Sequence, residues 1–266
     1  MTSIPNETAS NTATMPEASA LTAAALKEAI RLRTSRRSYT SKPIEAAAAD
    51  RLNQCIARIN ESTVGRIRFR LITGEPKAFS SILKTYGLFS GVHSYIVASG
   101  LKDDVMAQQL IGYYGEQLVL TATAMGLGSC WVGATCDKSP AMGELDPNGQ
   151  IYCLITLGYA REKASLGEKL VHAAISQKRP EKEALIDNPE QTRLPRWFMD
   201  GINAVRLAPS ARNRLPVHFS LKRGIVSAWA DKNGGYENID LGIAKLHFEL
   251  GADYIFYDLR KSLYIK

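Results

Sequence analysis

The feature that most constrains the fold is the segment 110–125, which is apolar on almost every side when it is drawn as a helix. A helix that is hydrophobic all round belongs in the interior of a protein, because none of its faces favours contact with water. Gly126 and Gly128 follow the segment and are expected to end the helix. The sequence therefore predicts one buried helix. Hydrophobic residues make up 45% of the chain, which is enough to form a core around it.

Shorter patterns predict further elements of both kinds. Apolar residues three and four positions apart indicate helices, whereas short apolar or alternating runs indicate strands. The predicted helices cover 23–33, 50–59, 197–207 and 239–250, and the predicted strands cover 67–72, 95–98, 151–157 and 217–221. Trp131 and Val132 are expected to lead into a loop at Gly133, and 162–171 is expected to be a polar connection.

The order of these elements partly repeats along the chain. Leu207 follows Ile59 by 148 residues, and Val217 follows Phe69 by the same distance, so one helix–turn–strand unit resembles another. A chance similarity of two common units is the alternative. The repeat predicts a first half at 21–178 and a second half at 197–266. Prolines at 180, 189 and 195 indicate a linker at 179–196, and the composition of residues 1–20, rich in Ser, Thr, Ala, Asn and Pro, indicates a disordered tail.

Composition bears on the location of the protein and on metal binding. No run of 18 apolar residues is present, and the first 20 residues lack the basic start and apolar centre of a secretory signal. We therefore expect a cytoplasmic protein without a membrane span. The four cysteines show no CxxC spacing and no histidine at ligand spacing, so we expect free thiols and no metal site.

The net charge of +7 would suit an anionic partner. The basic residues are scattered, however, and no known nucleic-acid-binding motif is present, so we expect no nucleic-acid partner. A small anionic ligand explains a local cluster of basic residues equally well.

Arg36, Arg37 and Ser38 form the most distinctive basic cluster. A phosphate monoester carries nearly two negative charges at neutral pH, and guanidinium forks with a short hydroxyl donor suit it. The alternative is a solvated basic turn, because cations are favourable after the C-terminus of a helix. The residues alone do not decide between these interpretations.

A second motif lies far along the chain, in the run Ala-Pro-Ser-Ala-Arg-Asn at 208–213. Pro209 fixes a bend, Ser210 offers a hydroxyl group, and Asn213 carries both a donor and an acceptor. Such a set suits the edge of a heterocyclic ring that alternates carbonyl and N–H groups. The alternative is a turn that only ends a helix.

Together these runs resemble the FMN-dependent nitroreductase family, in the branch that fuses two nitroreductase-like halves in one chain. The resemblance rests on RLRTSRRSYTSKPIE at 31–45, GLGSCWVG at 126–133 and the 208–213 run. It implies a nitroreductase-like α+β fold with two pseudo-symmetric halves, whose mostly antiparallel sheets are wrapped by helices. FMN would lie in the groove between the halves. Leu215 and Val217 stand where the family pattern has Gln and Trp, so the chain departs from the pattern there.

The resemblance also implies a role for each part of the site. The residues at 36–38 would hold the phosphate and the ribityl edge, with a basic residue after Gly158 and Tyr159 to complete the phosphate site. The backbone at 132–134 would lie near the reactive N5, and the 209–213 turn would meet the ring edge. The implied FMN-binding residues are Arg36, Arg37, Ser38, Val132, Gly133, Ala134, Arg161, Lys163, Pro209, Ser210 and Asn213.

The implied activity is hydride transfer from NAD(P)H through FMN to a nitroaromatic, a quinone or a similar acceptor. No side chain is nominated as catalytic, and Glu116 and His247 are interpreted as packed residues. The alternatives are a flavin-binding protein without turnover and a binder of nucleic acids or other anions. The chain is expected to act as a monomer, in which the halves form a pseudo-dimer, or as a homodimer.

Overall fold

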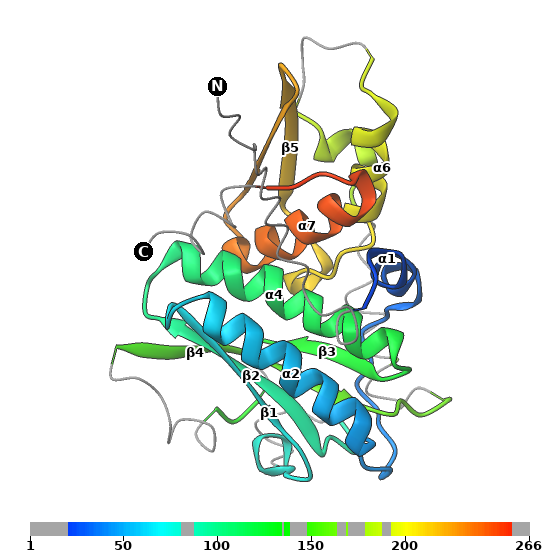
Figure 1. Cartoon of the computed structure of the whole chain (residues 1–266), viewed down its shortest axis with the longest axis vertical. Helices are drawn as coiled ribbons and strands as arrows, with labels where there is room; N and C mark the ends of the chain where they lie inside the picture. Colours follow the sequence, from blue (N-terminus) through cyan, green and yellow to red (C-terminus); the bar gives the residue numbers. More distant parts are fainter. Residues whose placement is uncertain are drawn as a thin grey trace, which may run out of the picture.

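The molecule has an α+β architecture in which helices cover antiparallel sheets (Figure 1). The structure, a computed structural model, describes residues 21–80, 88–134, 136–138, 148–163, 169, 179–187 and 193–256. The predicted α+β class is therefore confirmed. The predicted tail at 1–20 and most of the predicted connection at 162–171 lie outside the described residues.

The larger sheet has four strands in the order β1-β2-β4-β3, and every neighbouring pair is antiparallel. Its strands are β1 (Ile67–Ile72), β2 (Ser94–Leu101), β3 (Gly128–Val132) and β4 (Gly149–Gly158). The central strands β2 and β4 are almost wholly buried, which agrees with the apolar runs that predicted them.

Both faces of this sheet are covered. The side chains of successive residues in β2 point alternately to one face and to the other. Ile96 and Ala98 pack into the main core, which also holds the helices α2 (Ala46–Ser62) and α4 (Val105–Ala124). Tyr95 and Val97 point the other way, into a smaller apolar cluster. Figure 1 shows α2 and α4 lying across the same face of the sheet.

Helix α4 is the buried helix that the sequence predicted. It is packed between the sheet and α7 (Glu237–Ala252), and its buried residues lie on all of its sides (Figure 1). Two glycines let α4 and α7 approach closely. A Cβ on Gly112 would lie 2.1 Å from the carbonyl oxygen of Ile239, and one on Gly242 would lie 2.0 Å from that of Gln109. Each glycine thus meets the residue three positions before the other, so the crossing is symmetric.

The remaining elements repeat the order helix, strand, strand, helix. Helix α6 (Arg196–Val205) precedes the antiparallel strands β5 (Val217–Lys222) and β6 (Ile225–Ala230), and α7 follows. Arg223 and Gly224 form the two-residue turn of this hairpin, both with positive φ, as the twist of a tight hairpin requires. The same order is found in α2, β1, β2 and α4, although the division of the chain into halves stays a prediction.

Three features of the fold were not predicted from the sequence. The run 128–132 is strand β3, where a helix end and a loop were expected, and β6 was not predicted. The predicted linker is partly structured: it contains the 3-10 helix η3 (Lys182–Leu185), whose Leu185 is buried, and Ile186 bridges to Phe219 of β5. Helix α1 (Ala23–Leu32) and strand β1 match their predictions closely.

Candidate functional site

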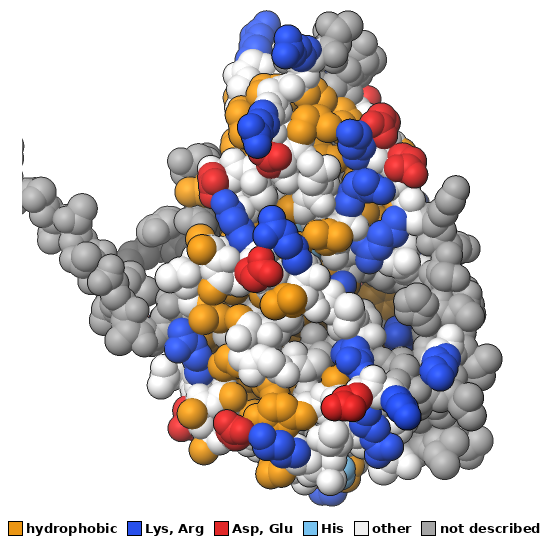
Figure 2. Space-filling model, turned by 90° about the vertical axis from the view of Figure 1, so that its right-hand side faces the viewer, with side chains coloured by type: hydrophobic (Ala, Val, Ile, Leu, Met, Phe, Trp, Pro, Cys, Tyr) orange, Lys and Arg blue, Asp and Glu red, His pale blue; other side chains and the backbone are white. Residues whose placement is uncertain are grey.

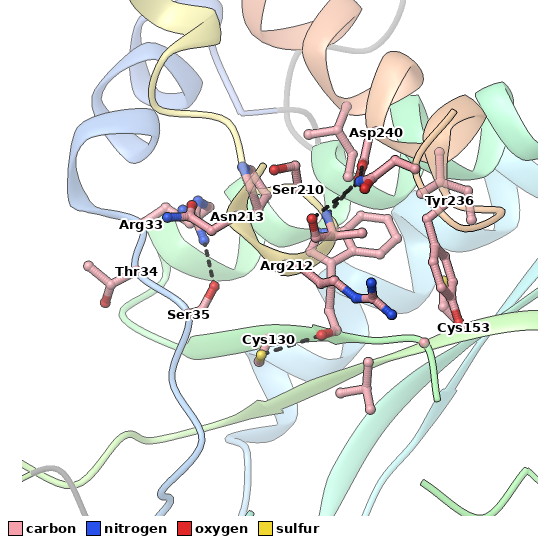
Figure 3. Close-up of a pocket in the computed structure, with 18 of the residues that line it drawn as sticks. Arg33, Thr34, Ser35, Cys130, Cys153, Ser210, Arg212, Asn213, Tyr236 and Asp240 are labelled. Atoms are coloured by element: carbon pink, nitrogen blue, oxygen red, sulfur yellow. Dashed lines mark hydrogen bonds between the residues drawn. The ribbon is translucent and has the colours of Figure 1, made fainter. Parts of the chain in front are cut away.

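A cavity of about 730 Å³ opens where segments from distant parts of the chain meet. Its walls come mainly from the end of α1 and the residues after it, the end of β3, the turn after α6 and the start of α7 (Figure 3). Arg179 adds a side chain from the predicted linker. The early basic segment and the late Ser-Asn turn therefore face one another across a single space.

The chain after α1 runs alongside the larger sheet, with isolated bridges from Ser35 to Ser129 and from Ser38 to Ser90. Arg33, Thr34 and Ser35 all line the cavity. From Ser35 onward the side chains alternate as in an extended segment, so Arg37 lines the cavity, whereas Arg36 and Ser38 lie outside its lining.

Arg36 and Ser38 make contacts on the other side of the segment. The Arg36 guanidinium donates to the carbonyl oxygen of Arg161, and that residue's Nε donates to the carbonyl oxygen of Tyr39 at 2.8 Å. Ser38 is fully buried, and its carbonyl oxygen accepts from the Arg161 backbone N–H at 3.0 Å. Lys163 is exposed and also lies outside the lining.

Three arginines converge at one end of the cavity, which we call the arginine end: Arg33, Arg179 and Arg206. Burial and the charges of the other two guanidinium groups lower the pKa of Arg179. Its Nη1 donates to the carbonyl oxygens of Arg206 and Ala208 at 2.6 and 2.7 Å. The Nε atoms of Arg33 and Arg206 are buried without a hydrogen-bond partner among the described residues.

Beneath the arginine end lies the fully buried carboxylate of Glu116, on α4. Its Oε1 is 3.8 Å from Arg33 Nε and 3.0 Å from His247 Nε2, and its Oε2 accepts from Trp131 Nε1 at 2.9 Å. His247 Nδ1 lies 3.1 Å from the carbonyl oxygen of Ala204, which can only accept. A hydrogen must therefore also lie between His247 and Glu116, and the two form a buried hydrogen-bonded pair.

This buried pair holds three walls of the cavity in place. Arg33 and Trp131 line the cavity directly, and Ala204 lies on α6, just before the turn that carries Ser210. Glu116 and His247 were predicted to be packed residues, and both are fully buried. Their contacts with the cavity walls could not be found from the sequence.

The end of β3 forms the opposite wall. Val132, Gly133 and Ala134 line the cavity, and the ring of Tyr236 covers Gly133. A Cβ on Gly133 would lie 2.4 Å from the Tyr236 hydroxyl oxygen, so only glycine allows this approach. Burial raises the pKa of Tyr236, and the nearby Arg212 charge acts in the opposite direction.

The turn after α6 contains the 3-10 helix η4 (Ala211–Asn213) and holds a strained backbone. Arg212, Asn213 and Leu215 have φ of 55°, 58° and 49°. This left-handed conformation is unfavourable in free energy for residues that have a Cβ. Two side chains fix it: Ser210 Oγ accepts from the Leu215 N–H at 2.8 Å, and Asp240 Oδ1 accepts from the Ala211 N–H at 2.9 Å.

Asp240 itself is buried against the turn and lines the cavity. Burial raises the pKa of its carboxyl to about 6, opposed by the hydrogen bonds from the Ala211 N–H and from Asn233. Asn233 Nδ2 donates to Asp240 Oδ2 at 3.1 Å and to the Ala211 carbonyl oxygen at 3.3 Å. The turn and the start of α7 are thereby tied together, as Figure 3 shows.

The structure brings most of the predicted site residues together. Seven of them line the cavity: Arg37, Val132, Gly133, Ala134, Pro209, Ser210 and Asn213. The other four lie outside its lining: Arg36, Ser38, Arg161 and Lys163. Leu215 and Val217, the two departures from the family pattern, are buried in the core. The role of each residue stays a prediction.

The lining is strongly basic. Asp240 is the one acidic residue among the described lining residues. Lys and Arg side chains also spread over the middle of the face shown in Figure 2, with fewer acidic ones between them. The arginines of the lining are Arg31, Arg33, Arg37, Arg179, Arg206 and Arg212.

Two further kinds of site can be assessed in the part of the chain that the structure describes. No helix there has both the length and the apolar character to cross a membrane. No group of three or more His, Cys, Asp or Glu side chains among the described residues could hold a metal ion. The four cysteines are free thiols, and burial raises the pKa of Cys153 to about 12.

The profile of the family described as "Putative TM nitroreductase" matches residues 25–252. No curated protein matches the sequence. The chain is similar to the crystal structure of a "putative nitroreductase" from Thermotoga maritima, with a TM-score of 0.56 and 23% identity over 85% of this chain and 82% of that one.

A second similar structure is a "putative nitroreductase in complex with FMN" from Desulfovibrio desulfuricans. It has a TM-score of 0.44 and 24% identity over 64% of this chain and 98% of that one. The likeness to the Thermotoga protein shows the fold, which is the predicted nitroreductase fold.

Proposed function

Because this chain belongs to the nitroreductase family, we propose that it is an oxidoreductase that uses FMN to pass a hydride from NAD(P)H to a small acceptor, such as a nitroaromatic or a quinone. The observation that carries the proposal is the basic cavity, whose walls come from the early basic segment, the end of β3 and the late turn. FMN would supply the redox chemistry, and the protein would bind and orient the reactants.

The cavity fits a flat ligand with an anionic end. Its volume of about 730 Å³ lies within the usual range for cofactor sites. Buried polar groups normally have hydrogen-bond partners, yet the Nε atoms of Arg33 and Arg206 have none among the described residues. Since these Nε atoms are themselves buried, the other guanidinium nitrogens of Arg33 and Arg206, two residues that line the cavity, are the suitable donors for a phosphate group.

We expect Arg33, Arg179 and Arg206 to hold the phosphate, with Arg37 beside them. Guanidinium forks bind phosphate in a bidentate manner, and the low exposure of Arg33 strengthens each contact. Glu116 balances part of this charge from below. The predicted contacts of Arg36, Ser38, Arg161 and Lys163 with the phosphate would require side chains that lie outside the lining to reach it.

The ring would lie at the opposite end, against the residues 132–134. Gly133 has no side chain to obstruct a flat ring, and the N–H groups of this strand end can donate to ring atoms. Ser210 and Asn213 would face the ring edge. Asp240 would orient this turn by accepting the hydrogen bond from the Ala211 N–H. Because FMN would supply the redox chemistry, no side chain is required to act as an acid or a base.

A flavin-binding protein without turnover is the second candidate, and one observation favours it. The Tyr236 ring already covers Gly133, where a flavin ring would approach. Turnover would require Tyr236 to rotate aside or to stack on the ring. A partly buried side chain of this length can rotate.

The test begins with the purified chain and added FMN. We expect one FMN per chain by equilibrium dialysis, with the yellow absorbance band of a flavoprotein, and bleaching of that band by NADPH or NADH without oxygen. A protein that takes up no FMN would contradict the proposal. A yellow protein that neither coenzyme bleaches would favour the second candidate.

A further inference from the structure

Arg212 stands apart from the other arginines of the cavity. It is exposed and lines the cavity, yet it makes no hydrogen bond or ion pair with another residue in the part of the chain that the structure describes. Arg179, by contrast, donates to two carbonyl oxygens, and Arg33 lies beside Glu116. The fold therefore provides no hydrogen-bond or ion-pair partner for the Arg212 guanidinium among the described residues.

The backbone at Arg212 is strained, and the surrounding residues maintain the strain. Its φ of 55° is unusual for a residue with a long side chain. The hydrogen bond from the Ala211 N–H to Asp240 and the one from the Leu215 N–H to Ser210 hold the turn from both sides. Strain that neighbouring residues enforce is concentrated at functional sites, where it places a group that acts on a ligand.

The turn directs this guanidinium to the end of the cavity opposite the arginine end. In Figure 3 the Arg212 side chain extends away from Arg33 and toward Tyr236. Its charge acts on the Tyr236 hydroxyl group, whose ring covers Gly133. Arg212 thus lies beside the proposed place of the flavin ring, where the acceptor must also bind.

The chemistry of this position suits a planar anion. A guanidinium group pairs with a carboxylate through two parallel hydrogen bonds, and it also stacks on aromatic rings. Both oxygens of Asp240, the nearest acidic group of the described lining, already accept hydrogen bonds from the turn and from Asn233. The Arg212 guanidinium therefore has no competing carboxylate in the described lining.

We propose that Arg212 is a specificity-determining residue that binds the carboxylate of an aromatic electron acceptor, such as a nitrobenzoate. The inference rests on the proposed function, since it places the acceptor beside the bound flavin. A pyridine nucleotide also carries anionic groups and could meet the same guanidinium, so the experiment must separate these two sources.

The experiment compares two acceptors of nearly equal shape, 4-nitrobenzoate and the neutral 4-nitrobenzamide. FMN-loaded wild type and the Arg212→Gln variant are titrated with each compound, with the flavin absorbance as the readout of binding, and kcat/KM is then measured. We expect Arg212→Gln to weaken 4-nitrobenzoate binding by about 10- to 100-fold, the range of a charge-assisted pair. Binding of 4-nitrobenzamide, FMN, NADH and NADPH should change by less than about twofold.

Arg214→Gln is the matched control, because Arg214 is exposed on the same turn and lies outside the lining. It should bind both acceptors as the wild type does. Equal loss for both acceptors, or a loss confined to NADH or NADPH, would overturn the inference. Failure of the wild type to bind FMN would refute the proposed function first, before the acceptors are compared.

Discussion

The two ends of the cavity hold their arginines in opposite ways. At the arginine end, the Arg33 side chain is 7% exposed and lies beside a fully buried carboxylate, and Arg179 is tied to backbone carbonyl groups. At the other end, Arg212 is exposed on a strained turn. The first end also holds Arg206, which is 36% exposed and pairs with Glu181, so all three of its arginines have partners in the fold. Arg212 at the second end lies on a loop and has no partner among the described residues.

This difference indicates that the two ends serve different purposes. A charge built into the core remains in one position, which suits a cofactor that stays bound. A charge on a strained turn, without a partner among the described residues, is available to a ligand that binds and dissociates in each turnover. The predictions below test this contrast, beginning with the largest expected effect.

The largest effect should follow from removal of the Glu116 carboxylate. In Glu116→Leu, Arg33 and His247 would both lose their acidic partner in a buried place. Breaking a buried pair from one side typically costs about 3–5 kcal/mol. We expect the free energy of unfolding in urea to fall by that amount.

Glu183→Gln is a suitable control, since Glu183 lies on the surface with a side chain that is 70% exposed. Its transition midpoint should stay close to that of the wild type. A Glu116→Leu protein as stable as the wild type would mean that the core does not depend on this carboxylate. The contrast between the two ends would then lose its basis.

The next effect concerns Asp240, which holds the strained turn. Burial raises the pKa of its carboxyl from 3.8 to about 6. Between these values the folded protein keeps a proton that the unfolded chain has lost, so the contribution of this group to stability falls as pH rises from 4 to 6. Two pKa units correspond to about 3 kcal/mol.

Asp240→Asn should abolish this dependence. Urea unfolding of both proteins at pH 4, 5, 6 and 7 gives the difference in their free energies of unfolding. We expect the variant to gain about 2.4 kcal/mol relative to the wild type between pH 4 and pH 7, because part of the full effect is already lost at pH 4. Parallel pH profiles of the two proteins would show that Asp240 titrates normally and does not lie in a desolvated place.

The third effect tests the arginine end against the prediction from the sequence. Arg33→Met should weaken FMN binding by about 10- to 100-fold, because one or more charge-assisted bonds to the phosphate are lost. Arg36→Met should have little effect, since Arg36 lies outside the lining. Equilibrium dialysis with FMN measures both, and the opposite ranking would support the phosphate contact that the sequence predicted for Arg36.

The sequence was sufficient for most helices and strands because their patterns are local. The repeat around Val217 predicted β5 closely, and the apolar segment 110–125 predicted α4, although this helix begins five residues earlier, at Val105. Strand β3 was missed because only three residues separate this five-residue strand from the end of α4. Strand β6 has the apolar sequence IVSAWA, but Ile225 and Trp229 are exposed, so its side chains do not show the apolar–polar alternation of a half-buried strand.

The site was predicted in part, and the reason is geometric. The 208–213 turn and residues 132–134 were found because they are continuous motifs. Arg33, Arg179 and Arg206 come from three separate segments, so no single run of sequence shows that they meet. Which residues of the extended run after α1 face the cavity depends on its pairing with Ser129 and Ser90, which only the fold determines.

The smallest effect should come from the backbone of Arg212 itself. Glycine adopts a φ of 55° without the clash of a Cβ, a clash that costs roughly 1–2 kcal/mol, although glycine also loses more entropy on folding. Arg212→Gly should therefore raise the free energy of unfolding by about 0.5–1 kcal/mol. Arg214→Gly should lower it by a similar amount, because Arg214 has an ordinary φ of −80°.

A stabilised Arg212→Gly protein that has also lost its preference for carboxylated acceptors would show that the chain keeps this arginine at a cost in stability. If the variant is destabilised instead, the side chain of Arg212 supports the turn, and the distinction between the two ends fails.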